Sequence, residues 1–367
     1  MKKIYLAILS VVAFFSAEAQ ESSSPLSLSG YVDTYYFANT NGVTSNLGAS
    51  GFERIFDQKA NNFQVGLAQL KTTYEAGSVT GVIDLTFGNH GDLGNYGNTQ
   101  SPLGAGIGTT GLAIKQAYMA WAMNDKVTFT AGQYGTHVGY EVIDAPVNFN
   151  YSLSNLFGNG PFYHTGIKMD VAVSDGFAFM VGVNNGLDSK DDNNKPKGLA
   201  AQVYLAPVDG WDLYLNYYGT NEGTKDDPFT YTWFDITTTY QATDNFLIGL
   251  NAVPYGGLKT GGDTKSWWGA ALYLDASLTE KFGLGLRAEH FDNSNGGIYL
   301  IDTNGDGTAV TSLTLTGSVD ITKNLIFKPE VRFDTYSPTS GYQLMDSDGL
   351  YNKNNQTTVG AAMIFHF

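Results

Sequence analysis

The segment Phe282-Gly-Leu-Gly-Leu-Arg-Ala-Glu289 decides the fold, because apolar residues alternate in it with polar or small ones. The segment Phe327-Lys-Pro-Glu-Val-Arg-Phe-Asp334 repeats this period of two, which is typical of β-strands with one apolar and one polar face. Arg287, Lys328 and Arg332 all fall on the polar face. Turning such a charge toward lipid would cost ~2 to 4 kcal/mol near the middle of a bilayer. We therefore expect these charges to point inward.

The connections between the expected strands alternate between short and long. Between Leu26 and Phe367 we expect about sixteen strands, most of about ten residues, which is the length that a tilted membrane strand requires. Every second junction is a tight turn, as at Ser174-Asp-Gly176, Thr279-Glu-Lys281 and Thr322-Lys-Asn324, and the junctions in between are long. Short periplasmic turns and long extracellular loops are typical of up-and-down antiparallel barrels. The sequence therefore predicts an all-β transmembrane barrel.

Residues 1–19 have the features of a secretory signal peptide. Lys2 and Lys3 precede an apolar run from Ile4 to Phe15, and Ala17-Glu-Ala19 matches an A-x-A cleavage site. The apolar run is too short for a helix that spans ~30 Å of hydrocarbon. We therefore expect an exported protein whose residues 20–367 form an outer-membrane barrel.

Charge and cysteine content exclude several classes of function. Removing residues 1–19 takes away two lysines and one glutamate, which lowers the formal net charge from −15 to −16. This acidity argues against a nucleic-acid partner, because such proteins carry basic patches. The chain contains no cysteine, which excludes disulfides, thiolate metal sites and thiol nucleophiles.

Aromatic residues cluster near the ends of the expected strands, where amphipathic rings prefer the headgroup level of a bilayer. The last strand alternates and ends at Phe367, and such a terminal aromatic residue resembles the signal by which outer-membrane barrels are recognised for insertion. The ring-bearing residues are Phe177, Trp211, Tyr240, Phe246 and Phe282 on the turn side, and Tyr218, Trp233, Trp268 and Phe291 toward the long loops.

The junction from 137 to 161 is the longest and differs from the others in carrying an apolar stripe. Leu153, Leu156 and Phe157 form this stripe within a short helical turn that Asn150 or Ser152 could cap. A loop with its own apolar face needs a surface to pack against, and a wide barrel offers its inner wall. We expect loop 137–161 to fold inward and narrow the pore.

Several short motifs resemble those of the OmpL-like β-barrel porin family of Bacteroidetes. They are Ser29-Gly-Tyr-Val-Asp33 with Tyr35-Tyr36, Gly132-Gln-Tyr-Gly-Thr136 with Gly139-Tyr-Glu141, and Asn150-Tyr-Ser152 with His164-Thr-Gly166. The family often has a proline after the threonine of the central motif, where this chain has His137. The resemblance implies a porin and brings with it no substrate and no catalytic residue.

Charged residues on the inward faces and on the long loop are the candidate pore-lining residues. Opposite charges around a constriction create a field that filters solutes by charge. The alternative is a solvated wall of mutual salt bridges without selectivity. The net acidity further predicts a mild cation preference. The candidates are Glu141 and Asp144 on the loop, and Lys168, Asp170, Arg287, Glu289, Lys328, Glu330, Arg332 and Asp334 on strands.

Two further motifs have alternative interpretations. Asp302, Asn304 and Asp306 have the D-x-N-x-D-G spacing of a calcium loop, but position 313, where an EF-hand has glutamate, is leucine. The segment is a candidate calcium site or a plain acidic loop, and no other cofactor is expected. His290 near Asp292 suggests a hydrolase site, yet no G-x-S-x-G or comparable nucleophile motif occurs and His290 falls on the outward face.

These observations predict a bacterial outer-membrane porin, not an enzyme, that lets small hydrophilic solutes diffuse passively. Its expected partners are outer-membrane lipid, the solutes and, because sixteen-stranded porins are often trimers, two further copies of the chain. The alternatives are a hydrolase built on a barrel and a closed barrel with a structural or adhesive role.

Overall fold

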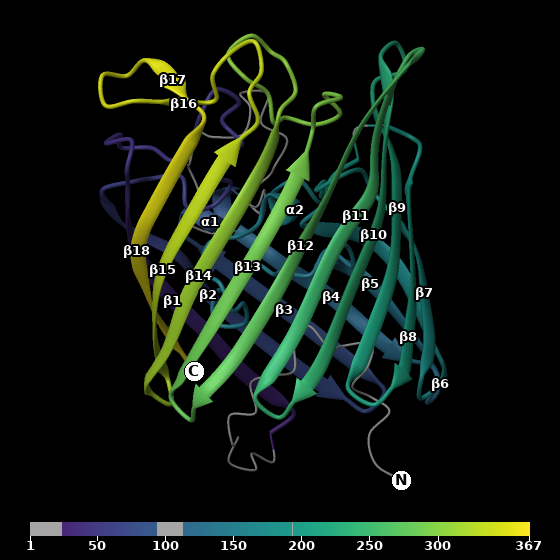
Figure 1. Ribbon diagram of the computed structural model, residues 1–367. Coiled ribbons are helices and arrows are strands. Elements are labelled where there is room, and N and C mark those ends of the chain that lie inside the picture. The colour runs from purple at the N-terminus through teal and green to yellow at the C-terminus, as the bar shows by residue number, and fades with distance from the viewer. Residues whose placement is uncertain (1–23, 94–112, 193) are drawn as a thin grey trace.

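The computed structural model describes residues 24–93, 113–192 and 194–367, and within them sixteen strands form one closed antiparallel barrel (Figure 1). The predicted signal peptide, residues 1–19, lies outside the described residues. In the described part of the chain, no helix is long and apolar enough to span a membrane. Each barrel strand pairs with the next barrel strand along the chain, and β1 closes the barrel against β18.

The strands follow the segments expected from alternation. The helices are short: α1 spans Asn89–Leu93 and α2 spans Asn155–Gly158. A small two-stranded sheet, β16 (Leu344–Met345) with β17 (Tyr351–Lys353), decorates the last long loop. The barrel strands are β1 (Leu26–Asn39), β2 (Asn62–Ala76), β3 (Val79–Phe87), β4 (Ala113–Ala122), β5 (Val127–Gly135), β6 (Tyr163–Ser174), β7 (Phe177–Asn184), β8 (Gly198–Val208), β9 (Trp211–Gly223), β10 (Pro228–Thr243), β11 (Phe246–Thr260), β12 (Asp263–Thr279), β13 (Phe282–Asp292), β14 (Ala309–Thr322), β15 (Leu325–Tyr336) and β18 (Asn355–His366).

The alternation of short and long junctions is confirmed except at two places. β9 and β10 are joined by residues 224–227, and β11 and β12 by Gly261 and Gly262 alone, because pairing continues almost to the tips of these hairpins. Gly261 has a φ of 55°, the left-handed conformation that a two-residue hairpin turn requires. The result is a tall group of hairpins that rises at the long-loop end of the barrel (Figure 1).

Inward and outward faces separate as predicted in the last third of the chain. Leu313 and Phe333 are exposed on the outer surface, whereas Thr314 and Arg332, which pair across the same ladder, are buried inside. A register shift between β1 and β2 interrupts the alternation of inward and outward residues along β2. Asp33 lies opposite both Gly66 and Leu67, and this bulge puts Phe63 outside and Leu67 inside.

The expected aromatic belt is confirmed at the turn side and wrong in part at the other end. Trp211, Tyr240 and Trp268 are exposed on the outer surface. Tyr218, Trp233 and Phe291 instead point inward and are buried at 0%, 1% and 0% exposure in one apolar cluster with Trp267 and Leu156. They are covered by side chains of the inward-folded loops, so the alternation of each strand, and not the depth in the membrane, decides where these rings lie.

Candidate constriction built by two inward loops

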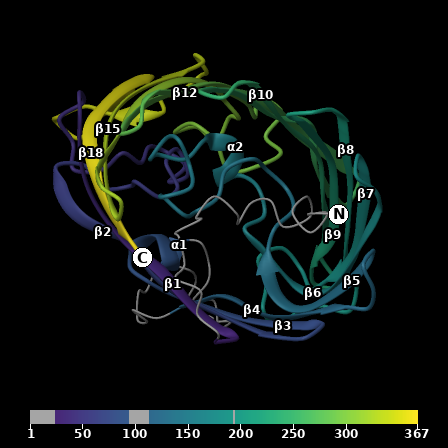
Figure 2. The ribbon, with the colours of Figure 1, turned by 90° about the horizontal axis from the view of Figure 1, so that it is seen from below.

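Loop 3, residues 136–162, lies inside the ring of strands, as seen along the barrel in Figure 2 through the position of α2. Its predicted apolar stripe has two faces. Leu156 packs on the wall with Trp233, Trp267 and Phe291, whereas Leu153 and Phe157 pack with Phe56, Ile143, Phe162 and Tyr163 in a second cluster inside the barrel. These apolar contacts therefore stabilise the inward fold of loop 3.

The cap of α2 differs from the prediction. Ser154, and neither Asn150 nor Ser152, occupies the N-cap, and its side chain accepts a hydrogen bond from the N–H of Phe157 at 3.0 Å. Asn150 and Ser152 instead face the wall, where the side chain of Asn150 donates to Thr316 at 2.8 Å and Ser152 contacts Arg287.

Two wall carboxylates hold the backbone of loop 3. Glu330 on β15 accepts hydrogen bonds from the N–H groups of Tyr151 (2.7 Å) and Ser152 (3.2 Å). Glu289 on β13 accepts from the N–H groups of Asn155 (3.0 Å) and Leu156 (2.8 Å). Hydrogen bonds to an ionised acceptor are roughly twice as strong as neutral ones, so each carboxylate is a strong anchor.

Three wall cations hold loop 3 through its carbonyl groups. Arg287 donates to the carbonyl of Ser152 (2.6 Å) and pairs with Glu141 at 2.5 Å. Lys328 donates to the carbonyls of Ala145 (2.9 Å) and Asn148, and Arg332 donates to that of Leu153 at 2.8 Å. With Glu289 and Glu330, these residues are almost fully covered by the loop, so they bind loop 3 itself instead of facing open lumen.

The remaining predicted residues lie on other sides of the lumen. Asp144, on loop 3, pairs with Lys115 of β4 opposite the wall just described, and Asp84 lies 3.7 Å from the same lysine. Lys168 and Asp170 form an ion pair of 3.1 Å on β6. The side chains of Asp144 and Lys168 are each 22% exposed, which distinguishes them from the covered anchors.

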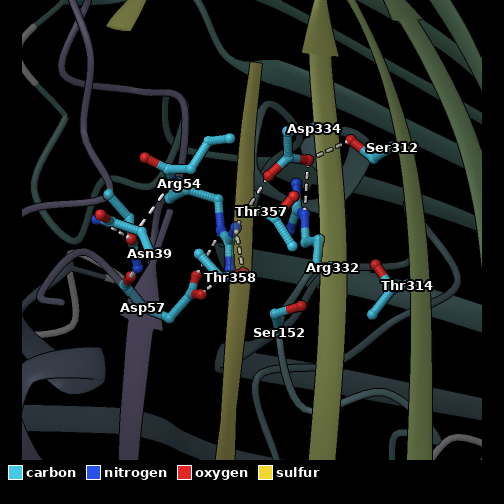
Figure 3. Close-up of polar contacts among 12 residues, drawn as sticks. Asn39, Arg54, Asp57, Ser152, Ser312, Thr314, Arg332, Asp334, Thr357 and Thr358 are labelled. Carbon is cyan, nitrogen blue, oxygen red and sulfur yellow. Dashed lines mark hydrogen bonds and ion pairs between the residues drawn. The ribbon is translucent and has the colours of Figure 1, made fainter. Parts of the chain in front are cut away.

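Loop 1, residues 40–61, also folds inward, which was not predicted from the sequence. Arg54 donates to Asp57 from Nε at 3.0 Å and again from Nη2, while Nη1 donates to Asp334 at 2.9 Å and Thr358 at 3.3 Å (Figure 3). Asp334 therefore has its partners in loop 1 and on the wall, where it accepts from Arg332 at 2.8 Å and Ser312 at 2.6 Å. The short segment Phe52-Glu-Arg-Ile-Phe-Asp57 has an apolar pair beside a charge, a signal like that of loop 3.

All arginines of the chain, Arg54, Arg287 and Arg332, lie in these anchors. A guanidinium group presents several donors in a rigid fork, which suits it to hold a carboxylate and a carbonyl at once. The lysines are spread over strands and loops. The arginines of this chain thus all hold the two inward loops in place.

The candidate calcium segment lies in loop 7, residues 293–308. Asp302 accepts hydrogen bonds from the N–H groups of Asn304 (2.7 Å) and Asp306 (2.9 Å) and from Thr339 (2.6 Å) and Gly341 (2.7 Å). Burial raises the pKa of Asp302, but these hydrogen bonds lower it below its ordinary value. Among the described residues no group of three or more histidine, cysteine, aspartate or glutamate side chains could hold a metal, and calcium binding stays a prediction.

His290 lies on the outer surface beside Trp268, with 5.2 Å between ring centroids, and its Nδ1 contacts Thr311 Oγ1 at 2.9 Å. It is therefore remote from the charged residues inside the barrel.

Comparison with protein families matches residues 25–367 to the family described as "Putative beta-barrel porin-2, OmpL-like". The chain belongs to this porin family. The porin is accordingly a protein of the bacterial outer membrane, and the fold and the family expected from the sequence are confirmed. No curated protein matches the porin in sequence.

Solved structures of other porins share the barrel of this porin. An anion-selective porin from Comamonas acidovorans has 13% identity and a TM-score of 0.62, covering 93% of this chain and 99% of that one. OmpF of Salmonella typhi, in complex with daunomycin, has 12% identity and a TM-score of 0.61, covering 93% and 97%. OmpT of Vibrio cholerae has 11% identity and a TM-score of 0.59, with the same coverage. At such identities the similarity concerns the fold alone.

Proposed function

We propose that this porin lets small hydrophilic solutes diffuse passively through a passage between loop 3 and the wall formed by β4 to β9. One contrast carries the proposal. Arg287 and Lys328, which point inward from β13 and β15, are covered by loop 3, whereas Lys168, Gln202 and Tyr214, which point inward from β6, β8 and β9, are half-buried among buried neighbours such as Asp170 and Asn216. Water and solutes would follow the less covered wall.

The charges along this proposed passage favour cations. An excess of carboxylates on the low-dielectric walls of a water-filled passage concentrates cations and repels anions. Ion pairs such as Lys168 with Asp170 offset part of this excess, so the preference should be mild. The inward charges of β4 to β9 are Lys115 and Lys168 against Asp170 and Asp212, to which loop 3 adds Asp144 and β3 adds Asp84.

Planar-bilayer recording with single-cysteine variants tests the passage directly, because the chain has no cysteine of its own. Modification of Gln202→Cys by a charged methanethiosulfonate reagent should reduce the current. Ala271→Cys, which also points inward but is fully buried, should not respond. Folded protein without conductance steps would remove the proposed function, and a current that labelling of Gln202→Cys leaves unchanged would show that the passage lies elsewhere.

The same recordings test selectivity. In a gradient of potassium chloride, the reversal potential should have the sign of a mild potassium preference. A reversal potential that favours chloride would contradict the acidic passage.

We further propose that the porin is a channel without hydrolytic activity and that it assembles as a trimer. The outward position of His290, away from the charged lumen, supports the first part. One of the similar structures is described as the trimer form of OmpT from Vibrio cholerae, which motivates the second. Phospholipid hydrolysis that is lost in His290→Ala would refute the first, and a monomeric mass in mild detergent would refute the second.

A further inference from the structure

Loop 1 covers the side of loop 3 that faces away from the wall. Phe56 packs against Phe157 and Phe162, with 5.6 Å between ring centroids in both pairs. Ile55 lies so close to Gly158 that a Cβ added at this glycine would be 2.8 Å from the Ile55 side chain. Without loop 1, the aromatic rings of loop 3 would face water in the lumen.

Alternating charges connect the two loops through the barrel wall. Asp57 binds Arg54 within loop 1, Arg54 reaches Asp334 on β15, and Asp334 binds Arg332, which donates to the carbonyl of Leu153 in loop 3 (Figure 3). The four charged side chains are at most 4% exposed. Breaking one pair in such a buried network leaves the remaining charges uncompensated, so the members depend on one another.

We propose that Arg54 is a positioning residue that fixes loop 3 through loop 1 and thereby sets the width of the passage. The inference rests on the proposed function. Removing the Arg54 guanidinium leaves Asp57 and Asp334 with Arg332 as their remaining cation in this network. Water must then enter to solvate the carboxylates, loop 1 loses its hold on the wall, and Phe157 and Phe162 lose their cover.

Single-channel recording of Arg54→Leu tests this role. Its conductance is expected to rise by a factor of about 1.5 to 2, because a loosened loop leaves more of the lumen to water. Arg54→Lys keeps the charge but not the forked guanidinium group, and its conductance should lie between those of Arg54→Leu and the unaltered protein. Lys259→Leu removes a charge from an exposed hairpin end and should match the unaltered protein. An Arg54→Leu channel with unaltered conductance would overturn the proposal. If Arg54→Leu does not fold, Arg54→Lys provides the same comparison.

A reversible crosslink between the loops separates positioning from general damage. The Cβ of Ile55 is 3.4 Å from the position of a Cβ at Gly158, near the ~3.5 to 4.5 Å that joins cysteines in a disulfide. In Ile55→Cys/Gly158→Cys, oxidation should leave the conductance unchanged. In the same pair combined with Arg54→Leu, oxidation should restore the unaltered conductance and a reducing agent should raise it again.

Two outcomes would count against the role of Arg54. A crosslinked Arg54→Leu channel that keeps the raised conductance would show that separation of loop 1 from loop 3 is not what widened the passage. An equal rate of crosslinking with and without Arg54 would show that the loops do not depend on it. The crosslinking rate needs no current, so it tests the positioning role even in a protein that does not conduct, the result that refutes the proposed function.

Discussion

The end of loop 3 should respond to pH through Asp188, and Asp188→Asn should abolish that response. Asp188 lies in loop 4, residues 185–197, with a left-handed backbone conformation (φ of 46°). Its Oδ1 accepts hydrogen bonds from the N–H groups of Phe162 at 2.7 Å and Tyr163 at 3.1 Å. Burial raises the pKa of Asp188 from the ordinary value of 3.8 to about 7, although these two hydrogen bonds lower it.

The size and sign of the effect follow from this pKa. At ~1.4 kcal/mol for each tenfold change in the proton equilibrium, ionising Asp188 in its buried place costs up to ~4 kcal/mol. Because the folded pKa lies above that of an exposed aspartate, the stabilisation is complete below the ordinary pKa and is lost as the pH rises through about 7. Asparagine keeps an oxygen acceptor for both N–H groups without the charge. Asp188→Asn should therefore hold this end of loop 3 equally well on either side of neutral pH.

Hydrogen exchange, measured by mass spectrometry on a peptide covering residues 156–163, reads out this local opening. After correction for the intrinsic pH dependence of exchange, the unaltered protein should lose protection between about pH 5 and about pH 9, and Asp188→Asn should not. Asp226→Asn, at an exposed hairpin end, is the matched control and should behave like the unaltered protein. Equal loss of protection in the unaltered protein and in Asp188→Asn would refute the reasoning.

Three further predictions concern anchors and loops. Glu330→Gln places an amide NH₂ opposite hydrogen-bond donors, so loop 3 should become ~2 to 3 kcal/mol easier to open, seen as faster limited proteolysis; unchanged proteolysis would contradict the anchor. Gly66→Ala puts a Cβ 2.2 Å from the Asp33 carboxylate and should lower the temperature of the heat-induced gel shift, with a cost of ~1 to 3 kcal/mol, whereas Gly81→Ala, with open space around it, should not. Calcium titration calorimetry tests the loop 7 segment: heat that is lost in Asp306→Asn would support a site, and an absent signal in the unaltered protein would contradict it.

Alternation made the barrel predictable, because the inward or outward direction of a strand residue depends only on its neighbours in sequence. The expected number of about sixteen strands and the named tight turns between them therefore agree with the structure. Alternation fails where a bulge intervenes, as at Gly66, since one extra residue reverses the face of everything after it. It also could not show that Trp233 would be covered from inside, because the covering residues come from distant loops.

The candidate site was predictable only in part, because contacts with distant loops also determine it. The sequence placed Arg287 and Glu330 on the inward face, but the partners that cover them lie more than a hundred residues away in loop 3. Arg54 was missed because it lies in a loop, where no periodicity assigns a direction to a side chain. A second apolar pair in loop 1, Ile55 and Phe56, was the available signal.

The hydrogen bonds of Arg54 connect the N-terminal part of the barrel to its last strands. Arg54 follows β1, whereas its partners Asp334 and Thr358 belong to β15 and β18, and β1 pairs with β18 only when the barrel closes. Contacts between residues so far apart in sequence form late, because closing a long loop costs entropy before any contact repays it. During biogenesis, loop 1 can therefore reach its place only once the first and last strands have met, so sealing of the barrel and assembly of its inner obstruction become one event.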